Sequence, residues 1–296
     1  MTEEPTSDAR TRRRAILFVL GSAGSFTVSA ALVKLAAPEI PVAEMMLFRS
    51  GVASVFMLPW VMRMGGWGLL KTRRPWGHLA RTVTGLAGMF GSFYGYARLP
   101  MAAVTALGFA MPIFLAMLSI PLLHERVTPS RLGAIAAALA GVLLVIRPWQ
   151  GAGGLPLFDT SVVLAGVLAW ALSMVSIRRM GKLGERNITI VLLFSLTCTV
   201  LSAILTAPVW VTPRPAMLPV LIGIGAVSGG AQLLMTEGYR SGEASMLAPF
   251  EYSAIFYTVA MGWAFWGEVP GPWEAAGMAV LVASGLFTWW RETRAG

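Results

Sequence analysis

Charged residues are scarce in this chain. Asp, Glu, Lys and Arg make up 12% of its 296 residues and hydrophobic residues 56%, whereas soluble domains carry about 25% charged residues. The apolar residues occur in blocks of about twenty, the length at which a helix crosses the hydrocarbon core of a bilayer. Strands would alternate apolar and polar residues with period two, and these blocks do not. The composition therefore predicts an all-α polytopic membrane protein and leaves no segment for a soluble domain.

Residue types that bind metals or catalyse acid–base reactions are also few. The chain has one cysteine, Cys198, two histidines, His78 and His124, and two aspartates, Asp8 and Asp159. It contains neither the H-E-x-x-H motif of zinc proteases nor the G-x-x-x-x-G-K-[ST] loop of ATP-driven motors. Both histidines are assigned to cytoplasmic loops. We therefore expect no metal, no cofactor and no enzymatic activity.

The charges that are present lie mainly between the apolar blocks. With the N-terminus in the cytoplasm, eighteen of the 23 Lys and Arg residues fall on the inner side, Arg81 among them. Four fall on the outer side, namely Lys34, Arg98, Arg147 and Arg214. Because basic residues are enriched in cytoplasmic loops, both termini are predicted to be cytoplasmic, in a bacterial-type inner membrane. The net charge of +9 is read as this topology signal, so no nucleic-acid partner is expected.

Proline, glycine and charged residues divide the chain into ten expected spans. Several of the intervening loops are very short, so neighbouring helices must be antiparallel. An even number of spans also agrees with two cytoplasmic termini. The expected spans are residues 15–37, 41–62, 77–97, 100–122, 130–148, 160–180, 187–209, 216–239, 244–267 and 272–290.

An internal repeat relates the two halves of the chain. YARLPMAAVTALGFAMPIFLAMLSIPLLHERVTP (96–129) aligns without a gap on YRSGEASMLAPFEYSAIFYTVAMGWAFWGEVPGP (239–272). In this alignment Phe109 meets Tyr252, and Glu125 meets Glu268. The sequence therefore predicts two five-helix repeats, 1–149 and 150–296, and because five is odd they have opposite orientations in the membrane. Such inverted repeats are an architecture of transporters.

These motifs resemble the EamA family of the drug/metabolite transporter superfamily. The likeness is carried by MLFRSG in the second span and by the run from FYGYARLPM to VLLVIRP through spans three to five, with a weaker copy in the last three spans. The resemblance implies a ten-helix carrier for amino acids, nucleosides or nucleobases, vitamins such as riboflavin, S-adenosylmethionine or drugs, without selecting among them. The second half departs from the pattern, since Ile255 replaces Pro112 and Glu251 replaces Gly108.

Glu251 is the sharpest candidate for substrate binding, because it is an acid within the apolar run SMLAPFEYSAIFYTVAMGWAFWGE (245–268). A charge near the bilayer centre costs about 2.5 kcal/mol or more, so it normally faces a cavity or a partner. Glu251 could bind a substrate amine or a proton in a central cavity. The alternative is a structural ion pair with Arg49, which lies at a similar depth in the second span. Arg49, itself a candidate for the site, could instead pair with Glu44.

Aromatic and polar residues complete the expected substrate site. An aromatic cavity with few polar groups suits a flat or amphipathic solute, and the resemblance implies that several of the spans carrying these aromatic residues line such a cavity. The alternative for each aromatic residue is packing against lipid or a neighbouring helix. Pro112 would kink the fourth span and free backbone carbonyls. The candidates are Tyr94, Phe109, Pro112, Trp170, Gln232, Tyr252 and Tyr257.

We therefore expect a secondary transporter that moves a small organic metabolite across the inner membrane by alternating access. Protons are a candidate coupling ion. The alternative is an integral membrane enzyme acting on a lipid-linked substrate, which would need a cluster of Asp, Glu or His at one membrane face that the sequence does not offer. The expected partners are the small-molecule substrate and membrane lipid, and the chain is expected to work as a monomer or a homodimer.

Overall fold

A computed structural model describes residues 4–64, 66–72, 74–111, 113–114, 117–118, 129–241 and 244–295. These residues form helices, 3₁₀ turns and loops, with no strand among them. The elements are α1 (Glu4–Ala36), α2 (Val42–Met64), η1 (Gly66–Leu70), α3 (Pro75–Arg98), α4 (Met101–Gly108), α6 (Pro129–Ile146), η2 (Pro148–Gly153), α7 (Leu157–Lys182), α8 (Asn187–Thr206), η3 (Ala207–Val209), η4 (Pro215–Met217), α9 (Leu218–Ser241), α10 (Ala244–Glu251), α11 (Ser253–Trp266) and α12 (Pro272–Ala295).

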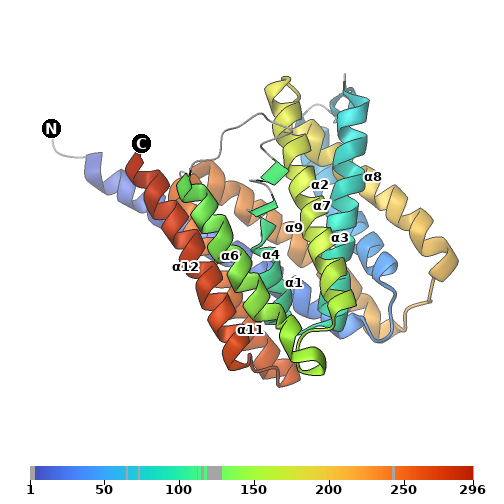
Figure 1. Cartoon of the computed structure of the whole chain (residues 1–296). Helices are drawn as coiled ribbons and strands as arrows, with labels where there is room; N and C mark the ends of the chain where they lie inside the picture. Colours follow the sequence, from blue (N-terminus) through green and yellow to red (C-terminus); the bar gives the residue numbers. More distant parts are fainter. Residues whose placement is uncertain are drawn as a thin grey trace.

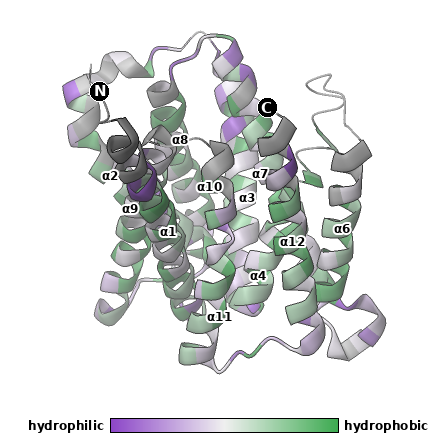
Figure 2. Cartoon of the chain, turned by 90° about the vertical axis from the view of Figure 1, so that its left-hand side faces the viewer, coloured by the Kyte–Doolittle hydropathy of each residue, from purple (hydrophilic) through white to green (hydrophobic). Residues whose placement is uncertain are grey.

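Four stretches of the described chain are long and apolar enough to cross a membrane. They are Thr11–Ala36, Leu157–Lys182, Thr189–Val209 and Pro215–Gly238, and a shorter apolar helix covers Ile135–Gly151. Hydrophilic residues gather toward the helix ends and the loops, while hydrophobic residues predominate along the middle of the helices (Figure 2). The prediction of an all-α membrane protein is confirmed.

The helices form one bundle whose two ends differ. Both chain termini lie toward one end, which we call the terminal end, and the loops after α1, α6 and α11 lie at the opposite end, the far end (Figure 1). Helix α1 packs on α9, α2 on α8, α3 on α7 and α6 on α12. Each of these pairs joins a helix from residues 1–149 to a helix from residues 150–296, so the two halves of the chain interlock.

Glycines allow two of these helix pairs to approach closely. A Cβ added to Gly91 of α3 would lie 2.6 Å from the Cα of Gly166 on α7. A Cβ added to Gly277 of α12 would lie 2.6 Å from the carbonyl oxygen of Gly141 on α6. Small residues have this role in membrane bundles, where helices associate through close packing rather than through exclusion of water.

The ninth span, expected as one helix over 244–267, is two helices in the structure. Helix α10 ends at Glu251, and α11 begins directly after Tyr252. The fourth span is interrupted in the same way, because α4 ends at Gly108 and Phe109 lies in the turn that follows. Phe109 and Tyr252 are the residues that the sequence repeat aligns. Both halves of the chain are therefore interrupted at equivalent positions.

Proline chemistry accounts for the interruption in the first half. Pro112 has no N–H to donate to the carbonyl of Gly108, four residues earlier, so one bond of the α-helical ladder is lost there and a break is favoured. The kink expected at Pro112 itself lies outside the described residues. In the second half Pro249 lies inside α10, two residues before that helix ends.

Replacing Gly91 by valine should force α3 and α7 apart, because the new side chain would overlap the backbone of Gly166. Overpacking of this kind costs about 1–3 kcal/mol, so thermal unfolding in detergent should occur at a clearly lower temperature. Gly230→Ala on α9 is the control, since no described atom lies within 4 Å of a Cβ at that position. A Gly91→Val variant as stable as the Gly230→Ala variant would contradict the close packing of α3 on α7.

Candidate functional site

The two helix interruptions meet in the structure. The rings of Phe109 and Tyr252 stack with their centroids 4.6 Å apart. The Tyr252 hydroxyl reaches α12 beside Gly285, in a space that any larger residue would fill. Glu251 is the half-buried last residue of α10. We call Phe109, Glu251 and Tyr252 the interruption site. Helix ends leave backbone groups without intrahelical partners, and such groups can bind a ligand.

Three other residues predicted for the site lie elsewhere. The hydroxyl of Tyr94 on α3 donates to Asp159 Oδ1 on α7 at 2.6 Å. Tyr257 on α11 packs against α1, where its ring would lie 3.7 Å from a Cβ added to Gly24. Gln232 on α9 is exposed. Tyr94 and Tyr257 thus have partners on neighbouring helices.

A second group of side chains surrounds Arg49 of α2. Its Nη1 donates to Met89 Sδ on α3 at 3.0 Å, and a thioether sulfur is a weak acceptor. Glu44, considered as its partner, accepts a hydrogen bond from the backbone N–H of Val211 at 3.2 Å instead. Within the described ranges Arg49 pairs with no carboxylate, Glu251 included. Neither structural ion pair considered for Arg49 is therefore formed.

Arg81, counted from the sequence as one of the basic residues of the inner side, belongs to the same group. It lies on α3 and is only 7% exposed. Its Nη1 donates to Ser173 Oγ on α7. Its guanidinium group lies 3.7 Å from the ring centroid of Phe194 and 5.4 Å from that of Trp170. The Arg81 Nε atom is buried and has no hydrogen-bond partner in the described part of the chain.

His78 is likewise a buried residue of α3 rather than a loop residue. Its Nε2 lies 3.4 Å from Glu185 Oε1, in the connection between α7 and α8. This contact joins the two halves of the chain.

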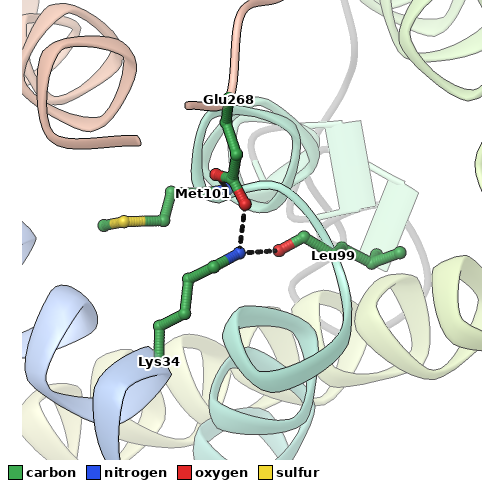
Figure 3. A network of polar contacts seen from close by, with 4 residues as sticks. All are labelled: Lys34, Leu99, Met101 and Glu268. Atoms are coloured by element: carbon green, nitrogen blue, oxygen red, sulfur yellow. Dashed lines mark hydrogen bonds and ion pairs between the residues drawn. The ribbon is translucent and has the colours of Figure 1, made fainter. Parts of the chain in front are cut away.

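A charged network ties three chain segments together at the far end (Figure 3). Lys34 at the end of α1 pairs with Glu268 after α11, and its Nζ also donates to the Leu99 carbonyl at 2.9 Å. The second carboxylate oxygen of Glu268 accepts from the backbone N–H of Met101 at 2.9 Å. Met101 opens α4, and a negative charge at a helix N-terminus is favourable. We call these four residues the far-end network.

Two more ion pairs lie at the far end. Arg147, after α6, pairs with Glu274 of α12 at 2.5 Å, and Arg214 pairs with Glu39 at 2.6 Å. A cavity of about 310 Å³ is lined by Arg147 and Glu274 together with Glu268 of the far-end network. All of these pairs join residues 1–149 to residues 150–296, so charge holds the halves together at this end.

A model of the EamA-like transporter family matches the chain twice, over residues 13–147 and 160–290. The chain belongs to the EamA-like transporter family. The resemblance inferred from the span motifs is therefore confirmed, and the family consists of transporters rather than enzymes.

Named transporters are similar to this EamA-family chain over most of their length. A riboflavin transporter of Rhizobium johnstonii is 30% identical, and the alignment covers 86% of this chain and 83% of that transporter. A pseudopaline exporter of Pseudomonas aeruginosa is 27% identical, and the alignment covers 91% of this chain and 93% of that exporter. An S-adenosylmethionine uptake transporter of Rickettsia conorii is 23% identical, and the alignment covers 85% of this chain and 84% of that transporter. These relatives support assignment of the chain as a small-molecule transporter of a bacterial membrane.

A solved crystal structure shares the fold of this family member. It has a TM-score of 0.68 and 17% identity, and the match covers 95% of this chain and 98% of the other. At this level of identity the likeness concerns the fold alone.

Sequence reasoning used Arg81 only as a signal for the inner side, and it missed the burial of Arg81 and the far-end network. No proline, glycine-rich or Asn/Asp signal separates Arg81 from the apolar residues that follow, and Pro75 at the first helical position marks an earlier helix start. The far-end network could have been suspected from the few basic residues that fall on the outer side. Lys34, Arg147 and Arg214 are three of the four basic residues that break the inner-side bias, and all three form ion pairs across the halves.

The far-end network should stabilise the fold in this state. Glu268→Gln leaves Lys34 without its counter-charge, and Lys34→Ala removes the other partner. Hydrogen bonds to charged groups contribute about 1.5–3 kcal/mol, reduced by solvent because the side chains are 13% and 22% exposed. We expect each single variant to unfold at a lower temperature, and the double variant to lose less than the sum. Strictly additive losses in detergent would contradict the pairing.

Proposed function

We propose that this EamA-family chain is a secondary transporter that carries a small organic metabolite across the inner membrane by alternating access. Its two repeats, residues 1–149 and 150–296, would each contribute five of ten spans in opposite orientations. In such a carrier each half can adopt the conformation of the other, which exchanges the side on which the central site is open.

The observation that carries the proposal is the stacking of Phe109 on Tyr252 at the two helix interruptions. Repeat-equivalent residues touch each other only close to the axis that relates the repeats. The double family match, once in each half, supports the same arrangement. Discontinuous helices near such an axis commonly form the substrate site of a carrier. We therefore propose the interruption site as part of the substrate site, with Arg49 and Trp170 as further contacts.

The charged contacts support a state that is closed at the far end. With both termini in the cytoplasm, as the distribution of basic residues favours, the far end would face the periplasm. The Lys34–Glu268 and Arg147–Glu274 pairs would then have to separate before a solute could enter or leave on that side.

The names of the relatives support a small organic substrate. They cover riboflavin, pseudopaline and S-adenosylmethionine, and include both an exporter and uptake transporters. We propose that Glu251 binds an amine of the substrate or a coupled proton, because it is the last residue of α10 and directly precedes Tyr252 of the stacked pair.

Glu251→Gln keeps the side-chain shape and removes the charge. Uptake into proteoliposomes, measured with amino acids, nucleosides, flavins and S-adenosylmethionine, should fall about tenfold or more, the equivalent of one lost charge-assisted contact. Any pH dependence of transport should weaken as well. Glu4→Gln at the start of α1 is the control and should transport like the unaltered chain. Unchanged rate, affinity and pH dependence in Glu251→Gln would remove Glu251 from the site.

A further inference from the structure

We infer that Arg49 and Arg81 together bind an anionic group, a carboxylate or a phosphate, of the transported substrate. The inference rests on the proposed transport function and adds to it the charge that the substrate must carry. Four observations support it: the position of the two guanidinium groups, the direction of the Arg81 side chain, the neutrality of the neighbours and the geometry of the donors.

Both arginines reach the same part of α3. The Arg49 guanidinium contacts Met89, and the Arg81 guanidinium reaches Gly85, where the missing side chain leaves it room. Gly85 and Met89 are about one helical turn apart, roughly 6 Å along the axis. The two groups are close enough to interact electrostatically. Two like charges in a bundle interior repel each other, and an anion between them would turn repulsion into attraction.

The direction of the Arg81 side chain is unusual for its position. Arg81 lies six residues after Pro75, about 9 Å from the start of α3 by helical rise. Helical side chains tilt toward the helix N-terminus, and long basic side chains near span ends normally extend toward water. Arg81 extends the other way, along α3 toward Gly85. A cation directed into the bundle against both tendencies indicates that its partner is found there.

The described neighbours of the two guanidinium groups bring no negative charge. Arg81 contacts a hydroxyl and two aromatic rings, and Arg49 contacts a thioether. Cys198 of α8 interacts electrostatically with both arginines, but a cysteine thiol is protonated at neutral pH. Each guanidinium carries five N–H donors, so donors remain for a ligand. The buried Arg81 Nε, unpartnered in the described part of the chain, is one of them.

The geometry suits a carboxylate or phosphate. A guanidinium group presents a planar fork of donors that matches the paired oxygens of these anions. The faces of Phe194 and Trp170 hold the Arg81 plane in position before a ligand arrives. A neutral substrate analogue would occupy the bundle without compensating the two cations, and should bind more weakly.

The test uses the full chain in proteoliposomes with matched probes that differ in one anionic group. Phenylalanine and phenylalaninamide form the carboxylate arm, and riboflavin 5′-phosphate and riboflavin form the phosphate arm. In at least one arm we expect the anionic member to be bound and transported about tenfold or more in preference to its partner. Arg49→Gln and Arg81→Gln should each abolish that preference. Arg63→Gln, an exposed arginine in the last turn of α2, should retain it.

The outcomes separate this inference from the proposed function. Transport of riboflavin or phenylalaninamide with no preference for the anionic partner overturns the anion site and leaves transport intact. The anion site is also overturned if Arg49→Gln and Arg81→Gln keep the full preference. If Arg81→Gln fails to fold, Arg81→Lys keeps the charge without the fork and should show a weakened preference. No flux of any probe overturns the proposed function, and this inference with it.

Discussion

A charge inside a membrane protein needs a compensating partner, and this constraint governs where the charged residues of this chain lie. At the far end the cations Lys34, Arg147 and Arg214 each find a carboxylate on the other half of the chain. In the bundle, Arg49 and Arg81 find a thioether, a hydroxyl and aromatic rings among the described residues. The same constraint accounts for the ion pairs at the far end and supports the proposed anion site in the bundle.

The packing of the helices is compatible with movement of one helix pair against another. Helix pairs such as α3 with α7 meet through glycines, whose flat surfaces let backbones approach. The charged contacts at the far end, in contrast, are discrete ion pairs, which would be exchanged for water in the proposed open state. The interruption site lies where the two halves touch through the equivalent residues Phe109 and Tyr252. Rigid pairs, a breakable charged contact and a shared central contact are the parts that a two-state carrier requires.

Much of the fold could be predicted from the sequence, because a bilayer imposes a strong composition and length signal on each span. The repeat alignment also matched Phe109 with Tyr252, which the structure brings into contact. Span edges were less predictable. The pattern of basic residues counts Arg81 toward the inner side, but it cannot show the burial of Arg81, which depends on Phe194 and Trp170 from other helices. Lys34 and Glu268 are 234 residues apart, and no local pattern could have paired them.

The central claim is that the far end opens and closes as the charged contacts there break and re-form, and a distance across that end tests it most directly. Leu35 and Val269, which are 49% and 71% exposed, flank the Lys34–Glu268 pair and can each carry a spin label once Cys198, the single native cysteine, is replaced. In lipid nanodiscs, pulsed electron paramagnetic resonance should record a short distance that matches this structure and a longer one whose share grows in the Glu268→Gln variant. One distance, unchanged by that variant or by a transported solute, would contradict the account.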